Sequence, residues 1–308
     1  MSYGERVPVS PRPLLAAAVT VLLWASAFVA IRHVSTDFSP GALSLGRLLV
    51  GSVVLGAALL KSGHAPVPRQ LWPRLLVCGV LWFGVYNVAL NAAERRVDAG
   101  TAALLVNVGP ILIALLAGLL LGEGFPRTLL LGGAVAFGGV VVIALATSSG
   151  EGSDLIGVLL CLVAAVAYAG GVVSQKPLLG HLSALQVTWL ACTIGAVACL
   201  PYLPSLAQGL GSAPASSSGW LVYLGVFPTA VAFTTWAYAL ARTSAGKMGA
   251  TTYLVPPVAI LLSWMLLGET PPALALLGGL LCLAGVSLTR RAPRTAPRDH
   301  VLRRAAGP

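Results

Sequence analysis

Apolar residues follow one another in ten long runs along this chain, and polar residues gather in the short segments between the runs. Each run holds about 20 residues, the length that an α-helix needs to cross a hydrocarbon layer about 30 Å thick. The pattern therefore predicts an all-α membrane protein with ten transmembrane helices. The predicted spans are 14–31, 40–60, 71–92, 99–121, 127–146, 155–175, 184–204, 219–240, 246–267 and 272–289.

Composition agrees with this pattern. Hydrophobic residues make up 57% of the chain and charged residues only 9%, whereas a soluble domain carries roughly a quarter of charged residues. Only residues 205–219, with the sequence SLAQGLGSAPASSSG, are expected to form a flexible loop of any size. No soluble domain is expected, so the functional residues must lie in or beside the bilayer.

Two turns of the chain have nearly the same sequence. LLLGEGFPRTLLLGG begins at Leu119 and MLLGETPPALALLGG begins at Met265, so the two stretches align without a gap at an offset of 146 residues. The residues that meet an identical residue at this offset are Ala99, Gly100, Pro110, Leu115, Leu116, Gly122, Glu123, Pro126, Gly132, Gly133, Gly139 and Val140.

A weaker match at an offset of 144 residues extends the repeat toward the N-terminus. The chain thus divides into two five-helix halves, 14–146 and 155–289, with an N-terminal segment 1–13 and a basic tail 290–308. Because five is odd, the second half enters the membrane from the opposite side, which predicts inverted repeats around one central site, as in many secondary transporters. The matched pairs are Trp24 with Tyr168, Arg32 with Lys176, Ser39 with Ser183, and Gly51 with Gly195.

Charge orients the predicted bundle. The net charge is +10, and most Lys and Arg residues lie beside helix ends or in the tail. With both termini in the cytoplasm, only Arg32, Arg95 and Arg96 fall on the outer side, as the positive-inside rule requires. The charge therefore predicts attraction of the tail to anionic lipid headgroups and no nucleic-acid partner. The first run and its Ala25-Ser26-Ala27 resemble a signal peptide, but the counterpart later in the chain favours retention.

The sequence contains no motif of cofactor or metal chemistry. No Walker A loop, dinucleotide GxGxxG, HExxH, GxSxG elbow or clustered aspartates are found, so we expect no cofactor, no metal and no enzyme. The cysteines all lie in apolar spans without a CxxC pair, which favours small buried hydrophobes over disulfides. They are Cys78, Cys161, Cys192, Cys199 and Cys282.

The order of the motifs resembles a known family. LLWASAFVAIR at 22–32, an arginine in the second span, AGTAALL at the start of the fourth, two LLGE turns and a closing GGVVV or AGVSL resemble the EamA-type transporters of the drug/metabolite transporter superfamily. The resemblance covers residues 14–290. It implies ten helices in two inverted halves, a central cavity, and export of amino acids or other small metabolites across a bacterial plasma membrane.

Arg47 is the one charged residue deep inside a predicted span, where it is costly unless it faces a cavity or a partner. It matches the arginine found in the second helix of the family. Two interpretations stand side by side: Arg47 attracts a substrate carboxylate, or it snorkels or ties helices together through carbonyl oxygens.

A polar stripe is predicted on the third span. Phe83, Asn87, Asn91 and Glu94 recur at helical spacing, so they share one face, which must point into the bundle. Asn87 and Asn91 line a substrate cavity or form interhelical hydrogen bonds. Glu94 is the candidate for proton coupling, although exchange and facilitated diffusion fit the sequence equally well.

Other residues offer a flat apolar surface with a polar group, or an amide, to a substrate. Trp24 and Tyr168 are included because the offset places them at equivalent depth in the first helix of each half. These substrate-binding candidates are Trp24, Tyr86, Asn107, Tyr168, Trp236 and Tyr253.

The repeated turns are expected to be structural. Gly122 and Gly268 suit the left-handed residue that ends a helix, and a glutamate before the next helix, Glu123 or Glu269, can accept its free amides. A role of these glutamates as proton carriers is the alternative. Pro110 and its equivalent Pro256 lie within predicted spans, where they form hinges or only shape the helices.

Together these features predict a monomeric secondary transporter whose partners are a small-molecule substrate and the lipid bilayer. It would work by alternating access in a bacterial plasma membrane, with export favoured. A channel-like pore is the first alternative, and a membrane-embedded sensor or structural protein is the second.

Overall fold

The structure is a computed structural model that describes residues 11–120, 127–148, 154–243 and 245–289. Within these ranges the chain is helical and contains no strand. The helices are α1 (Pro11–Val34), α2 (Pro40–Ser62), α3 (Trp72–Cys78), α4 (Tyr86–Ala93), α5 (Ala99–Val106), α6 (Gly109–Leu120), α7 (Arg127–Ser148), α8 (Leu155–Leu178), α9 (Ala184–Ala198), α10 (Leu203–Ser212), α11 (Ala215–Leu224), α12 (Ala232–Arg242), α13 (Ala245–Gly249), α14 (Val255–Leu267) and α15 (Ala273–Thr289).

Short 3-10 and π-helical segments join several of these helices. The 3-10 segments are η1 (Arg69–Leu71), η3 (Leu200–Tyr202) and η5 (Ala250–Leu254), and the π-helical segments are η2 (Gly79–Val85) and η4 (Gly225–Val231). A π-helical turn opens the backbone hydrogen-bond pattern and is found frequently at functional sites.

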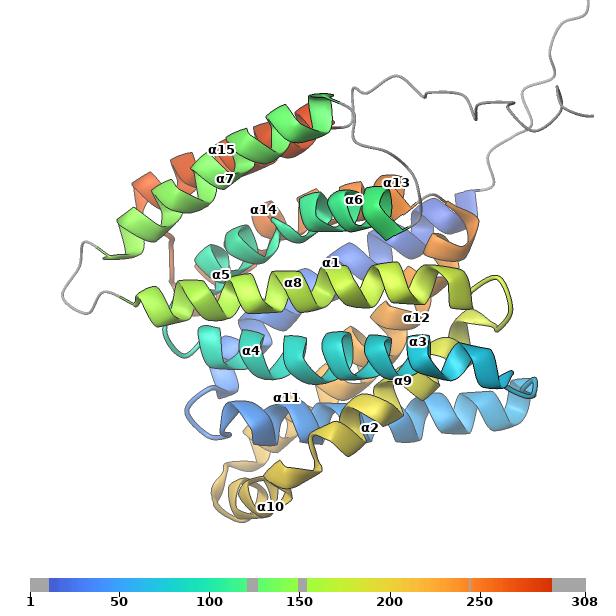
Figure 1. Cartoon of the computed structure of the whole chain (residues 1–308). Coiled ribbons are helices and arrows are strands. Elements are labelled where there is room, and N and C mark those ends of the chain that lie inside the picture. Colours follow the sequence, from blue (N-terminus) through green and yellow to red (C-terminus); the bar gives the residue numbers. More distant parts are fainter. Residues whose placement is uncertain (1–10, 121–126, 149–153, 244, 290–308) are drawn as a thin grey trace, which may run out of the picture.

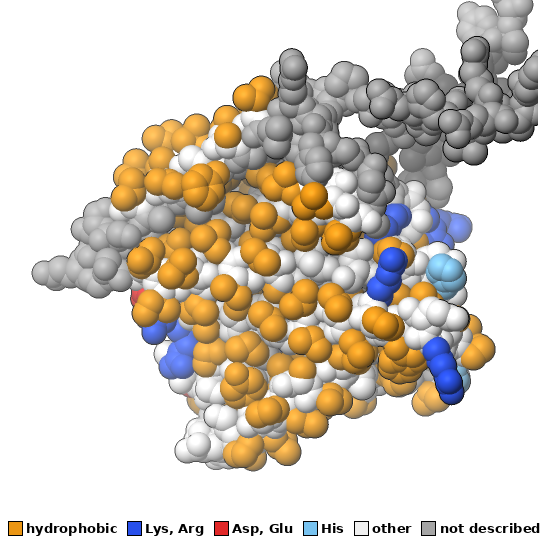
Figure 2. All heavy atoms as spheres, viewed as in Figure 1, with side chains coloured by type: hydrophobic (Ala, Val, Ile, Leu, Met, Phe, Trp, Pro, Cys, Tyr) orange, Lys and Arg blue, Asp and Glu red, His pale blue; other side chains and the backbone are white. Residues whose placement is uncertain are grey.

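Six helices of the described residues are long and apolar enough to cross a membrane, and a seventh is added if two segments bent by 54° form one span. The bent pair is Ala184–Ala198 with Leu200–Ser212, and the shorter apolar helices are Thr251–Leu267 and Ala273–Gly285. Figure 2 shows apolar side chains across the middle of one face, with Lys and Arg side chains at its two ends. This distribution is the one expected of a multi-pass membrane protein.

The residues predicted to form a loop at 205–219 are helical instead. Leu203–Ser212 forms α10, and α11 already begins at Ala215. Leu206 and Gly209 of α10 are buried, and Gly209 lies against the ring of Phe38. The loop prediction was wrong because it relied on small polar residues and did not foresee that this apolar side would be covered.

Equivalent helices of the two halves pack against each other. Figure 1 shows α7 and α15 side by side along one edge, and α2 packs on α9. A Cβ atom added to Gly139 of α7 would lie 2.5 Å from the carbonyl oxygen of Gly278 in α15, so only glycine permits this approach. The first helix of each half packs on the other half: α1 contacts α12 and α14, and α8 contacts α4 and α6.

The element boundaries follow the offsets seen in the sequence. α1 and α8 begin at Pro11 and Leu155 and end at Val34 and Leu178, in both cases 144 residues apart. Ser39 and Ser183 each cap the following helix by accepting a hydrogen bond from the backbone N–H three residues on. The π-helical segments η2 and η4 begin at Gly79 and Gly225 and end at Val85 and Val231, 146 residues apart.

Candidate functional site

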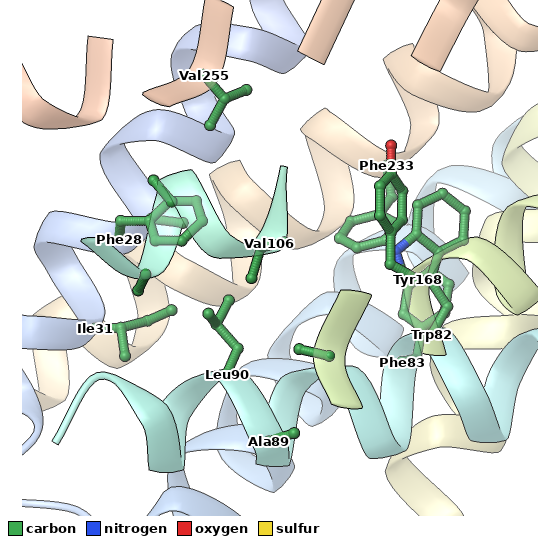
Figure 3. Packing of buried hydrophobic residues seen from close by; sticks show 14 of the residues in the cluster. Phe28, Ile31, Trp82, Phe83, Ala89, Leu90, Val106, Tyr168, Phe233 and Val255 are labelled. Atoms are coloured by element: carbon green, nitrogen blue, oxygen red, sulfur yellow. The ribbon is translucent and has the colours of Figure 1, made fainter. Parts of the chain in front are cut away.

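Aromatic rings from both halves of the chain meet in the middle of the bundle. The ring centroids of Trp24 and Trp236 are 5.0 Å apart, those of Trp82 and Phe233 are 5.0 Å apart, and those of Trp82 and Tyr168 are 5.5 Å apart. Figure 3 shows Trp82, Phe83, Tyr168 and Phe233 gathered together. We call this set the aromatic cluster; its members are Trp24, Trp82, Phe83, Tyr86, Tyr168, Phe233 and Trp236.

A cavity lies beside the aromatic cluster. Trp24, Trp82, Tyr86 and Tyr168 form part of its wall, together with the polar side chains of Asn107 and Thr252 and apolar residues such as Phe28 and Val255. The Nε1 atom of Trp24 and the Nδ2 atom of Asn107 are buried without a hydrogen-bond partner among the described residues. A ligand with acceptor oxygens would satisfy such donors.

Arg47 of α2 lines a smaller adjoining cavity. Its side chain is buried, and its Nε donates a hydrogen bond of 3.0 Å to Thr229 Oγ1. Thr229 in turn donates to the carbonyl oxygen of Leu224 over 2.8 Å. Within the described part of the chain, the bond to Thr229 is the one hydrogen bond of the guanidinium, so its other N–H groups can serve a ligand.

The two cavities share Trp24, Phe28 and Tyr86 as a common wall. Arg47 therefore lies at one end of the site and Asn107 with Thr252 at the other. An apolar and aromatic wall with a few polar groups is typical of small-molecule sites. The charged end suits a carboxylate, because a guanidinium binds carboxylates through two parallel hydrogen bonds.

The two asparagines of the polar stripe have protein partners. Asn87 donates from Nδ2 to the carbonyl oxygen of Phe83 over 2.8 Å, within its own helix. Asn91 donates to Ser44 Oγ over 2.9 Å and to the carbonyl oxygen of Pro40 over 3.2 Å, which ties α4 to α2. Both are buried but neither is part of the wall of the two cavities described above.

The remaining aromatic candidates differ in position. Trp236 is fully buried within the aromatic cluster, 5.0 Å from Trp24. Tyr253 packs against Ile111, and its neighbour Thr252 lines the larger of the two cavities instead. The structure therefore brings together Trp24, Arg47, Tyr86, Asn107 and Tyr168 at the cavities.

A group of charged residues lies where α4 ends. Arg32 donates from Nε to Glu269 over 2.9 Å and from Nη1 to the carbonyl oxygen of Glu94 over 2.7 Å. The Glu94 side chain is fully buried. The equivalent cation of the second half, Lys176, donates to the carbonyl oxygen of Leu240 over 2.6 Å, and Leu240 is the residue 146 positions after Glu94. The same contact between a cation and a helix end thus occurs in each half.

The predicted turn and hinge residues are placed as follows. Gly268 ends α14 with φ of 69°, the left-handed conformation that favours glycine. Glu269 pairs with Arg32, while Gly122 and Glu123 lie outside the described residues. The fourth span is interrupted at residues 107–108, so Pro110 lies in the first turn of α6 and Pro256 in the first turn of α14. Proline is well tolerated there.

Sequence reasoning missed several residues of the site. Trp82 and Phe28 line the cavity, and each lies four residues from an aromatic candidate on the same helix, Tyr86 and Trp24, so helical spacing could have found them. Thr229, which lies 146 residues after Phe83, was not among the predicted site residues. Its contact with Arg47 had no sequence signal, because 182 residues separate the two.

Comparison with known proteins gives a consistent result. The sequence profile of the EamA-like transporter family matches residues 12–145 and again residues 155–291. A protein of Streptantibioticus cattleyicolor named "Probable terminal-alkyne amino-acid exporter" is 41% identical over 277 residues, which cover 90% of this chain and 92% of that protein. A Salmonella typhimurium protein named "Probable amino-acid metabolite efflux pump" is 27% identical over 280 residues, 88% of this chain and 92% of that protein.

The "Uncharacterized transporter YdfC" of Bacillus subtilis is 32% identical over 277 residues and covers 90% of each chain. A solved crystal structure has a similar fold, with a TM-score of 0.63 at 23% identity over 90% of this chain and 95% of the other.

Proposed function

Because this chain belongs to the EamA-like transporter family, we propose that it exports a small carboxylate-bearing metabolite, an amino acid or a related compound, across a bacterial plasma membrane. Membership in this family makes the chain a membrane transporter and not an enzyme. The observation that carries the proposal is Arg47, a buried cation with one side-chain partner among the described residues, at a cavity walled by aromatic rings. The names of two relatives, an amino-acid exporter and an efflux pump, support the direction and the substrate class.

In the proposed binding mode the substrate carboxylate meets Arg47, and the rest of the molecule lies along the aromatic wall toward Asn107. Trp24, Tyr86 and Tyr168 contact the apolar part of the substrate. The other four candidates do not contact the substrate in this mode and instead support the helices and rings that form the wall. They are Asn87, Asn91, Trp236 and Tyr253. Recognition of a carboxylate with an apolar side chain follows from one guanidinium facing several rings.

The architecture that we propose has ten membrane-spanning helices in two inverted halves, 14–146 and 155–289, with both termini in the cytoplasm and a single copy as the working unit. The shared offsets of α1 with α8 and of η2 with η4 support two equivalent halves. The double match of the family profile supports them as well. Labelling of single cysteines introduced at positions 124 and 270 tests the inversion, which requires opposite sides.

Alternating access follows from this architecture, because two equivalent halves can exchange inward-open and outward-open conformations around one site. The breaks before Pro110 and Pro256 are the proposed hinges, since each separates two helical segments within one span. The Arg32–Glu269 pair joins the two halves at the outer end in the present conformation.

Counterflow in proteoliposomes tests the proposal. The full chain is reconstituted and loaded with one unlabelled amino acid at a time, including residues with apolar and alkynyl side chains, and uptake of the labelled compound is measured. Saturable counterflow that Arg47→Gln removes and Arg69→Gln leaves intact is the expected result; Arg69 is an exposed arginine at the start of η1. Non-saturable flux without counterflow would indicate a channel, and normal counterflow by Arg47→Gln would reject the binding mode.

A further inference from the structure

Glu94 is a buried acid that the proposed substrate site does not use. Among the acidic residues that the structure describes, it alone is fully buried, with an exposed fraction of 0%. Neither carboxyl oxygen has a hydrogen-bond partner among the described residues. A carboxylate ion in this position would lack the donors that its charge requires, so the surroundings favour the protonated carboxyl group.

Arg32 connects Glu94 to the end of the bundle. Its guanidinium holds the Glu269 carboxylate on one side and the backbone carbonyl oxygen of Glu94 on the other, at 2.9 and 2.7 Å. The side chains of Arg32 and Glu269 are partly exposed, with fractions of 30% and 28%, so this pair is open to rearrangement. The charge of Arg32 also acts on the Glu94 carboxyl group, so one cation faces two acidic side chains.

Titratable or charged groups from several elements act on Glu94. These groups are Arg32 from α1, Arg47 from α2, Tyr86 from α4, Asp98 ahead of α5, Cys161 from α8, and Glu269 between α14 and α15. Burial raises the pKa of Glu94 well above its ordinary value. The charges of Arg32 and Arg47 oppose this rise, whereas Glu269 and Asp98 add to it.

We propose that Glu94 is the proton-binding residue that couples export to proton movement, and that its proton controls the Arg32–Glu269 ion pair. With the proton bound, Glu94 is neutral and Arg32 stays with Glu269. When the O–H bond breaks, the proton passes to water and the electron pair stays on the carboxylate, which then takes Arg32 from Glu269. The segment before α15 is thereby released from α1.

The second half has no carboxyl group at the position equivalent to Glu94, which is Leu240. Lys176 contacts the carbonyl oxygen of Leu240 as Arg32 contacts that of Glu94, but leucine cannot bind a proton. Protonation of Glu94 therefore has no counterpart at Leu240, and this difference between the two halves gives the transport cycle a direction. The coupling role rests on the proposed export function, whereas the proton site and the exchange of Arg32 between carboxylates do not.

Infrared difference spectroscopy of the purified full chain tests the proton site. We expect the carbonyl stretch of a protonated carboxyl group to persist at neutral pH and to disappear only in alkaline buffer. Glu94→Gln should remove this band, and Asp98→Asn should keep it, since Asp98 is a half-buried helix cap that bonds Thr101. Absence of the band at neutral pH, or its persistence in Glu94→Gln, would overturn the proposal. If Glu94→Gln does not fold, Glu94→Asp must shift the band.

Cysteine labelling tests the exchange of Arg32. Ile31, next to Arg32, is fully buried, so Ile31→Cys should be protected from a membrane-impermeant maleimide while the Arg32–Glu269 pair is closed. We expect labelling, corrected for the native cysteines and normalised to the unfolded protein, to rise when alkaline pH removes the proton of Glu94. Protection at all pH values is expected after Glu94→Gln, and labelling at all pH values after Glu269→Gln. An identical pH profile with and without Glu94 would refute the exchange.

Neither measurement needs a transported solute. A negative counterflow screen with a titrating Glu94 band would reject the export proposal alone. Counterflow that proceeds normally, with no protonated band, would reject the proton site alone.

Discussion

The two π-helical segments, η2 and η4, have the same backbone conformation, but an aromatic and a polar residue have changed places between the two halves. At the first of two equivalent positions η2 has Phe83 and η4 has Thr229; four residues later the first half has Asn87 and the second has Phe233. Because aromatic and polar residues are exchanged, Phe83 and Phe233 meet with ring centroids 4.5 Å apart. The polar residues each bond a backbone carbonyl oxygen, that of Phe83 or Leu224.

Because of this exchange, η2 and η4 have different roles at the centre of the bundle. η2 supplies rings to the aromatic cluster, whereas η4 supplies the hydroxyl group that positions Arg47. A duplicated scaffold can thus surround one asymmetric substrate, since the backbone repeats while the chemistry differs. The predictions below test whether the two segments have these separate roles.

Removal of the largest ring of η2 should give the largest effect. Trp82→Ala deletes a side chain that is 1% exposed and touches the rings of Trp24, Tyr168 and Phe233, so we expect a loss of about 3 kcal/mol in the free energy of unfolding. Unfolding in mixed detergent, followed by circular dichroism, measures it. Trp220→Ala removes an exposed tryptophan from α11 and serves as the control. Equal losses in both variants would mean that the aromatic cluster has no special packing role.

The hydroxyl group of η4 should affect transport more than folding. Thr229→Val leaves Arg47 without its side-chain partner, so we expect counterflow to fall about tenfold, the equivalent of one charged hydrogen bond of about 1.4 kcal/mol. Thr229→Ser should restore it. Thr234→Val is the matched control, because Thr234 donates to the carbonyl oxygen of Ala230 within the same stretch of helix and does not contact Arg47 among the described residues. A similar loss in Thr234→Val would remove the special role of Thr229.

The family, the helical fold and many interior residues could be predicted from the sequence, because long apolar runs and a 146-residue repeat can be seen without knowledge of the packing. Arg47 could be identified since a lone charge within a span is costly. The short π-helical segments could not be predicted, because Gly79–Val85 has the same apolar character as the helix on either side.

The partners of the charged residues were also beyond sequence reasoning. Glu269 was expected to cap the next helix, and in the structure its Oε1 atom bonds Arg32, 237 residues away. Only the packing of α1 against α14 brings these residues together. Similarly, Asn87 and Asn91 have the spacing of cavity-lining residues, yet their Nδ2 atoms bond the backbone and Ser44. Periodicity reports which face is buried, but not what that face meets.

Asn87, in α4 directly after η2, distinguishes a structural role from contact with the substrate. Asn87→Leu removes the bond to the Phe83 carbonyl oxygen, and we expect a loss of about 1 kcal/mol in unfolding free energy with an unchanged KM in counterflow. Asn91→Leu, which also loses the link between α4 and α2, should cost at least as much. A large rise of KM for Asn87→Leu alone would instead place Asn87 in contact with the substrate.

The smallest effect should be a change in how steeply stability depends on pH. It tests the difference between Glu94 and Leu240, which lie at equivalent positions after η2 and η4. Burial raises the pKa of Glu94 above its ordinary value, so the folded chain binds this proton more tightly than the unfolded chain. Its contribution to stability is therefore fully present below the unfolded pKa of about 4.3 and is lost as the pH rises through the folded pKa. We expect the melting temperature of the wild type to fall toward alkaline pH more steeply than that of Glu94→Gln, with Asp154→Asn behaving as the wild type. Parallel curves for wild type and Glu94→Gln would mean that Glu94 binds its proton equally well in the folded and the unfolded chain. Replacement of Glu94 by leucine at the equivalent position of the second half would then have no effect on proton binding.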